Sequence, residues 1–356
     1  MATDQRALER FFQGVADQTP TPAWSHLHLV HWPGDCSPLV PLTAAGFQGT
    51  TLTVARASIV RVARERFPQL GVIPTDHPTA GQPADHVLME LPQGRTATRL
   101  TVTAALGQLS PTGALWLFGR RDGGILWAAK RFTGATTVLS RGHLRLLRLP
   151  RDSLFQERPG DPPPPAIPAD GFLPLDVAGL TLATRPGLFS WDSPDPASLL
   201  LLAALEDTPP VPRLLDWGCG SGLLGVALAR RWPGCRVTMT DDQFSAVACA
   251  RQSAAWNGVD KRCQIWAEAG IGETLSKHTF DAIVTNPPFH RGVATDRHTT
   301  PTFLRAAAQR LAPGGSLWVV GNRFLDYGTR LAQVLTRVRQ VADDGRFTVW
   351  QGHRQA

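Results

Sequence analysis

The chain has 356 residues, enough for two domains of ordinary size, and 43% of them are apolar while 18% are charged. This composition excludes an intrinsically disordered chain. The longest apolar run, Ala197 to Leu205, is far shorter than the roughly 20 residues that cross a bilayer. Met1 to Phe12 lacks the basic-then-apolar order of a secretion signal, so we expect a cytoplasmic protein.

The net charge of +7 is carried almost entirely by arginine, because Lys130, Lys261 and Lys277 are the only lysines. Arginine binds phosphate through two parallel hydrogen bonds and stacks on bases. A codon bias toward arginine would explain the choice of residue but not the positive sign. The charge therefore favours a polyanionic partner such as RNA.

The five cysteines form no Cys-x-x-Cys pair and have no histidine at the spacing of a metal ligand. We therefore expect buried free thiols and no metal site.

In chain order, residues 1–158 show the alternation of helices and strands that is typical of an α/β domain. The pattern predicts helices over 6–15, 57–67 and 97–109, the last leading into the segment 110–119, and strands over 50–54 and 84–92. Residues 159–169 contain four consecutive prolines, which favour a semi-rigid polyproline II spacer. We therefore place a linker there and a second domain at 170–356.

The second block is predicted to begin with a hairpin around Ala178-Gly179 and continues as another α/β pattern. It predicts helices over 197–205, 226–231 and 302–311, and strands over 213–217, 236–240 and 280–285, with a third strand in chain order that ends within 265–269.

Part of the first block resembles part of the second. Six residues between Leu109 and Gly119 are identical to the residues 202 positions later: Leu109, Pro111, Gly113, Leu115, Trp116 and Gly119. We interpret this as an internal duplication of one α/β unit. The first copy has Glu90-Leu91-Pro92 where the second has Asn286-Pro287-Pro288, which predicts that the first copy supports or binds rather than catalyses.

A glycine loop follows the strand that ends at Trp217. Its glycines are Gly218, Gly220 and Gly222, which permit close approach of the backbone to a ligand. The run also satisfies Gly-x-Gly-x-x-Gly, so a nicotinamide dehydrogenase is an alternative on this segment alone. Asp216 argues against it, since a carboxylate there repels a pyrophosphate but attracts a sulfonium or an ammonium. Asp241, at the end of the next strand, is expected to accept two ribose hydroxyls.

The strand over 280–285 ends at Asn286-Pro287-Pro288-Phe289. This loop brings an amide, a stiff backbone carbonyl and an aromatic face to one place, which suits an amino group on a flat ring. Parallel strands open on a common edge, so we expect this loop to face the glycine loop.

Together these motifs resemble a class I S-adenosylmethionine-dependent methyltransferase that acts on an amino nitrogen. More narrowly, the chain resembles the bacterial ribosomal RNA guanine-N2 methyltransferases of the small-subunit type C family. The segments that carry this likeness are Pro186-Gly187-x-Phe189-Ser190, Asn286-Pro287-Pro288-Phe289-His290-x-Gly292, Asn322-x-Phe324-Leu325-x-Tyr327 and Gly345-Arg346-Phe347. One departure is Asp195-Pro196-Ala197-Ser198, where the family has Asp-x-Gly-Ser.

The resemblance implies two tandem Rossmann-like domains, of which the first is degenerate and the second catalytic. It implies S-adenosylmethionine as methyl donor and the N2 amine of a guanine in 16S ribosomal RNA as acceptor, with the RNA or the small subunit as partner. The alternatives are a guanine in 23S ribosomal RNA, or a non-catalytic RNA-binding assembly factor of the same fold. A monomer is favoured.

The implied site has three groups of residues. Catalysis is assigned to Asn286, Pro287 and Phe289. Cofactor binding is assigned to Asp216, Gly218, Gly220, Gly222, Asp241 and Glu268, the last as a displaced contact of the adenine amino group. Substrate binding is assigned to Phe189, His290, Arg291, Arg323 and Tyr327.

Overall fold

The computed structural model describes residues 2–18, 26–29, 51–68, 70–75, 83–268, 270, 272, 274–287 and 293–355. The chain divides into two compact units, 1–166 and 167–356. The division falls inside the proline-rich segment 159–169.

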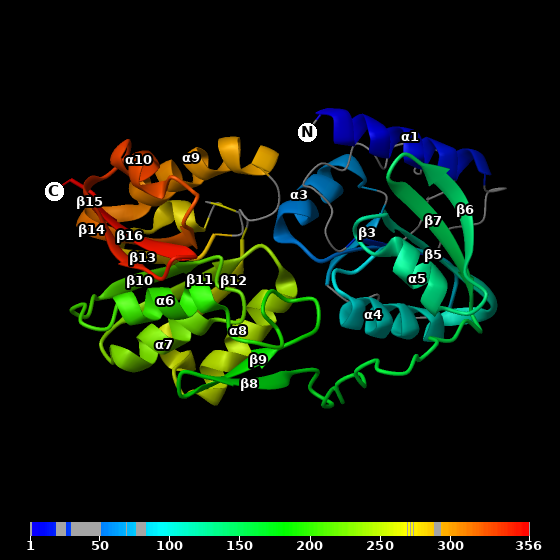
Figure 1. The fold of residues 1–356 in the computed structure, drawn as a ribbon, viewed down its shortest axis with the longest axis horizontal. Helices are drawn as coiled ribbons and strands as arrows, with labels where there is room; N and C mark the ends of the chain where they lie inside the picture. The colour runs from blue at the N-terminus through cyan, green and yellow to red at the C-terminus, as the bar shows by residue number, and fades with distance from the viewer. Residues whose placement is uncertain are drawn as a thin grey trace. The chain divides into compact units, whose positions relative to one another are not determined.

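The first unit contains a seven-stranded sheet in the order β3-β2-β1-β4-β5-β7-β6 (Figure 1). Its elements are α1 (Ala2–Gln18), β1 (His26–Leu29), β2 (Thr51–Val54), α3 (Ala57–Arg66), β3 (Gly71–Pro74), β4 (Ala84–Glu90), α4 (Arg95–Gly107), β5 (Leu109–Arg120), α5 (Ile125–Arg131), β6 (Thr136–Arg141) and β7 (Leu144–Pro150). β1 to β5 pair in parallel, and β7 pairs antiparallel with both β5 and β6.

The second unit repeats this topology in the order β12-β11-β10-β13-β14-β16-β15, with a separate hairpin of β8 and β9. Its elements are β8 (Leu173–Val177), β9 (Leu180–Thr184), α6 (Pro196–Ala204), β10 (Arg213–Trp217), α7 (Leu223–Arg231), β11 (Arg236–Asp241), α8 (Phe244–Trp256), β12 (Cys263–Ala267), β13 (Phe280–Thr285), α9 (Val293–Arg310), β14 (Leu311–Asn322), α10 (Tyr327–Ala332), β15 (Thr336–Asp343) and β16 (Phe347–His353). The predicted hairpin is confirmed, with Ala178 and Gly179 both at positive φ.

The duplicated residues occupy equivalent places in the two sheets. β5 and β14 each have 12 residues and begin at Leu109 and Leu311. A Cβ on Gly113 would lie 3.0 Å from the carbonyl oxygens of Ala84 and Asp85, and one on Gly315 would lie 2.9 to 3.1 Å from three backbone carbonyl oxygens. The same close approach of neighbouring strands therefore requires glycine in both copies, which explains why these residues match.

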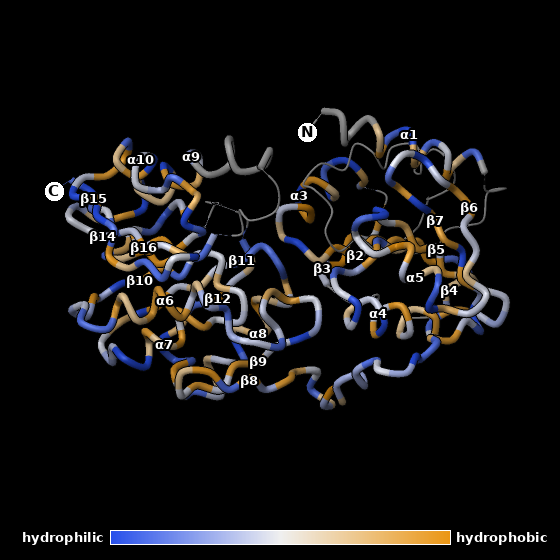
Figure 2. The backbone as a smooth tube through the Cα atoms, in the orientation of Figure 1, coloured by the Kyte–Doolittle hydropathy of each residue, from blue (hydrophilic) through white to orange (hydrophobic). Residues whose placement is uncertain are grey.

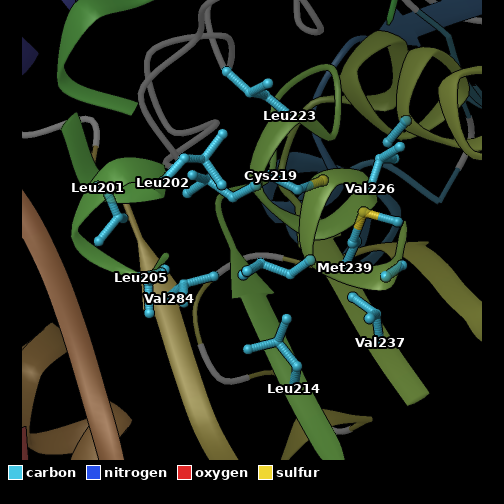
Figure 3. Packing of buried hydrophobic residues seen from close by; sticks show 14 of the residues in the cluster. Leu201, Leu202, Leu205, Leu214, Cys219, Leu223, Val226, Val237, Met239 and Val284 are labelled. Carbon is cyan, nitrogen blue, oxygen red and sulfur yellow. The ribbon is translucent and has the colours of Figure 1, made fainter. Parts of the chain in front are cut away.

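Helices cover both faces of the second sheet, giving three layers with apolar strands between them (Figures 1 and 2). On one face, side chains from α6, α7 and α8, including Leu201 and Val226, form a hydrophobic cluster with strand residues such as Met239 of β11 (Figure 3). On the other face, Leu304 from α9 and Leu331 from α10 belong to a second cluster. Burial of these apolar stripes holds the strand ends, and thus the loops that follow them, in fixed positions.

Several predicted boundaries differ from those of the structure. The helix predicted over 226–231 begins at Leu223, because Gly222 takes the N-cap position with φ of 90°. The helix predicted over 302–311 begins earlier, at Val293, and continues through Pro301. The helix predicted over 97–109 ends at Gly107, because Leu109 already belongs to β5.

Candidate active site

The glycine loop and the Asn-Pro loop leave the second sheet at the same edge, as the strand pattern predicted. β10 pairs in parallel with β11 on one side and with β13 on the other. The hydroxyl of Thr285, the last residue of β13, donates a 2.7 Å hydrogen bond to the carbonyl of Trp217, the last residue of β10. This buried bond ties the starts of the two loops together.

The glycine loop forms a backbone cradle. Gly218, Gly220 and Gly222 have φ of 77°, 55° and 90°, values that L side chains rarely adopt. A Cβ on Gly218 or Gly220 would meet no atom within 4 Å. The backbone N–H groups of Gly218 and Cys219 both donate to the carbonyl of Thr240, at 2.9 and 3.0 Å. The loop is therefore held from one side and open on the other, as close approach of a ligand requires.

Asp216 lies behind this loop with only 1% of its surface exposed. Its Oδ2 accepts a 2.8 Å hydrogen bond from the N–H of Gly225, whereas its Oδ1 is buried and has no hydrogen-bond partner among the described residues. Burial, followed by the negative charge of Asp241, raises the pKa of Asp216 to about 7, although the bond from Gly225 lowers it. An unpartnered buried carboxylate oxygen is expected to attract a cationic ligand group.

Asp241 joins the end of β11 to the glycine loop. Its Oδ2 accepts from the N–H of Gly220 at 3.0 Å, and its Oδ1 accepts from the N–H of Gln243 at 2.9 Å. Each carboxylate oxygen has a second lone pair. These bonds fix the orientation of the carboxylate, and its contact with two ribose hydroxyls stays a prediction.

Glu268 follows β12 and lies largely buried. Its carboxylate accepts hydrogen bonds from the Trp266 indole (3.1 Å) and from the backbone N–H groups of Thr274 (2.8 Å) and Leu275 (3.1 Å). These bonds hold the loop after β12, a structural role that the sequence did not suggest. Its contact with the adenine amino group stays a prediction.

The side chain of Asn286 is anchored from behind. Its Nδ2 donates to Asp195 Oδ2 at 2.7 Å and to Ser198 Oγ at 3.0 Å. Asp195 is also the N-cap of α6 and accepts from the N–H of Ser198 at 2.8 Å. The sequence did not indicate Asp195 and Ser198 as site residues. The only local signals are that Asp195-Pro196 is typical of a helix start and that the segment 195–198 departs from the family pattern.

The other predicted site residues differ in how exposed they are, and some lie outside the described residues. Pro287 is buried at the strand end, whereas Phe289, His290 and Arg291 lie outside the described residues. Phe189 is 58% exposed and Tyr327 only 1%. The Tyr327 ring packs in the core beside Gly321, so its position does not support direct contact with a base. Arg323 is exposed and forms an ion pair with Asp343 at 3.3 Å.

Within the described ranges, no group of three or more His, Cys, Asp or Glu side chains could hold a metal ion. No helix in those ranges is long and apolar enough to cross a membrane.

This fold, with both loops on one sheet edge, is that of a class I methyltransferase, and the Methyltransferase small domain family matches residues 179–351. The ribosomal RNA small subunit methyltransferase C of Pseudomonas aeruginosa (strain LESB58) is 35% identical over 292 residues, which cover 81% of this chain and 84% of the relative. The chain therefore belongs to the ribosomal RNA small subunit methyltransferase C family.

Two further relatives agree with this assignment. The methyltransferase of the same name from Hahella chejuensis (strain KCTC 2396) is 34% identical over 274 residues, covering 76% of this chain and 78% of the relative. A solved structure of the T. thermophilus 16S rRNA N2 G1207 methyltransferase, in complex with AdoMet and guanosine, superposes with a TM-score of 0.78. It is 26% identical, and the match covers 98% of this chain and 92% of that one.

Proposed function

We propose that this protein transfers a methyl group from S-adenosylmethionine to the exocyclic N2 amine of a guanine in 16S ribosomal RNA, in the cytoplasm. The observation that carries the proposal is the Thr285–Trp217 bond, which fixes the Asn286 loop beside the glycine cradle. The superposed T. thermophilus enzyme, which acts on 16S rRNA and was solved with AdoMet and guanosine, supports the choice of donor, base and subunit. The net charge of +7 fits an RNA substrate.

The residues of the cradle fit S-adenosylmethionine. The open space above Gly218 and Gly220 admits a ligand against the backbone, and the buried Oδ1 of Asp216 offers an acceptor for a cationic group. Asp241 would accept the ribose hydroxyls. When bound, S-adenosylmethionine supplies an electrophilic methyl group on a positively charged sulfur.

The Asn286 loop acts on the amine. The N2 lone pair of guanine is delocalised into the ring, so the amine is a weak nucleophile. The side-chain oxygen of Asn286 and the carbonyl of Pro287 each accept one N–H, which turns the lone pair toward the methyl group and stabilises positive charge on nitrogen. Pro287 stiffens the carbonyl, and Phe289 stacks on the base, which must leave any duplex to enter. The product loses its extra proton to water.

The first unit is proposed to support the RNA rather than to catalyse. It has the same strand order, but the end of β4 carries Glu90-Leu91-Pro92 in place of the Asn-Pro loop. Leu91 is buried, and its Cβ lies 2.8 Å from where a Cβ on Gly119 would stand. Leu91, which matches Pro287, therefore contributes to packing, and Glu90 stands where the second unit has the amide of Asn286.

Transfer of labelled methyl groups to purified 16S and 23S ribosomal RNA, to 30S particles and to RNA with inosine at the labelled position tests the proposal. Label is expected in 16S RNA, alone or assembled, as N2-methylguanosine after digestion to nucleosides. Inosine lacks the 2-amino group and is expected to take none. Label in 23S RNA or on adenine would overturn the choice of substrate. Binding of cofactor with no transfer to any RNA would instead support a non-catalytic assembly factor.

A further inference from the structure

The amide of Asn286 has only its carbonyl oxygen left to contact a substrate. A side-chain amide has two N–H donors and one carbonyl acceptor. Both donors of Asn286 have protein partners, Asp195 Oδ2 and Ser198 Oγ. The remaining group, Oδ1, can only accept. An unanchored asparagine could instead rotate and present its NH₂ group to a carbonyl or a ring nitrogen.

We propose that Asp195 and Ser198 are positioning residues that hold Asn286 as an acceptor-only amide, and so restrict the site to substrates that present an N–H donor. This inference rests on the proposed function, since it explains how the site selects an amino group. The two residues lie 91 and 88 positions before Asn286, so the contact arises only through the fold.

The negative charge of Asp195 adds to its effect as a positioning residue. The bond to Asp195 is short, at 2.7 Å, as expected for a donor facing a carboxylate. The negative charge of Asp195 beside the NH₂ group polarises the amide and makes Oδ1 a stronger acceptor. Positive charge grows on the substrate nitrogen as the methyl group transfers, so this polarisation stabilises the transition state more than the ground state.

The anchor is rigid because it belongs to a packed helix. Asp195 caps α6 and Pro196 occupies its first turn. Leu201 and Leu202 of the same helix are buried in the core of the second unit, as Figure 3 shows. Asn286 is thereby fixed to an element that does not have to rearrange during the reaction.

Four substitutions test this proposal. Asp195→Ala removes the anchor and the helix cap, whereas Asp195→Asn keeps an acceptor for the cap and for Asn286 but removes the charge. Asn286→Asp places two carboxylates in contact. The double variant Asp195→Asn/Asn286→Asp leaves one carboxylate in the pair, and residue 286 again presents an acceptor to the substrate. Residue 195 can donate to it only by rotating away from the cap bond, because a single oxygen, Asp195 Oδ2, accepts from both Asn286 and the N–H of Ser198.

We measure kcat and KM for 16S RNA, S-adenosylmethionine affinity by calorimetry, and the unfolding temperature of each variant. Loss of positioning is expected to lower kcat by about 10²-fold for Asp195→Ala and about tenfold for Asp195→Asn, with cofactor affinity within about twofold of wild type. Asn286→Asp is expected to be nearly inactive, and the double variant to recover at least about tenfold of the lost kcat.

The matched control is Asp281→Asn. Asp281 also bridges two elements, accepting from the backbone and guanidinium of Arg213, but at the start of β13, the opposite end of the strand from Asn286. Its kcat is expected to stay within about twofold of wild type. A folded Asp195→Ala that keeps wild-type kcat, or a double variant no more active than Asn286→Asp, would overturn the inference. An inactive wild-type protein would instead contradict the proposed function.

Discussion

The affinity for S-adenosylmethionine is expected to depend on pH through Asp216. The carboxyl has to ionise before it attracts a cationic ligand, and its pKa in the ligand-free protein is about 7. At that pKa about 3% of the carboxyl is ionised at pH 5.5 and about 50% at pH 7.0. The affinity is therefore expected to rise about 15-fold across this interval.

The same carboxyl makes the ligand-free fold less stable as the pH rises. Its pKa in the folded chain, about 7, lies above the ordinary value of 3.8. The folded state therefore binds the proton more tightly, and this contribution to stability is present below the unfolded pKa and is lost as the pH rises through the folded pKa. A difference of about three pKa units corresponds to roughly 4 kcal/mol once the group is fully ionised.

Isothermal titration calorimetry of the wild type and of Asp216→Asn between pH 5.5 and 7.0 measures the first effect. Asparagine can accept from the N–H of Gly225 as aspartate does, but it does not titrate. The variant thus corrects for titration of the ligand itself. Thermal unfolding of both proteins without ligand measures the second effect, and the wild type should lose more stability than the variant toward pH 7. Equal pH slopes in the two proteins would refute the reasoning.

Three further substitutions have definite expected outcomes. Asn286→Ala should leave S-adenosylmethionine affinity nearly intact in calorimetry while lowering kcat by about 10²-fold or more, and near-normal transfer would contradict the mechanism. Asp241→Ala should weaken cofactor binding in the same assay, whereas unchanged affinity would mean that the ribose contact is misplaced. A Cβ at Gly225 would lie 2.4 Å from Met239 Sδ, so Gly225→Ala should lower the free energy of unfolding by about 1–3 kcal/mol. Gly234→Ala, whose Cβ would meet no atom within 4 Å, is the control in denaturant titrations and should change stability far less.

Much of the fold follows from local patterns in the sequence. Short, largely apolar runs were sufficient to place β10, β11 and β13, because buried parallel strands need nearly continuous apolar side chains. The duplication was also visible, since Gly113 and Gly315 are required by the same close approach of neighbouring strands. Helix boundaries were less accurate where α9 continues through Pro301, against the ordinary preference of proline.

The sequence predicted the positions of candidate site residues that lie within one motif, but not contacts between residues that only the fold brings together. Asp216, Asp241 and Asn286 each follow or end a strand, so the rule for parallel sheets placed them on one edge. The anchoring of Asn286 by Asp195 joins residues 91 positions apart and leaves no local pattern. For Glu268, sequence position suggested a ligand contact, whereas three hydrogen bonds in the structure give it a role in holding a loop.

The central claim, methylation of a guanine N2 amine in 16S ribosomal RNA, is tested most directly by mass mapping of ribosomal RNA modifications in cells with and without the gene. The account predicts loss of one N2-methylguanine from 16S RNA, restored by the wild-type gene and not by Asn286→Ala. An unchanged 16S RNA, or a methyl group missing from 23S RNA or from adenine, would contradict it.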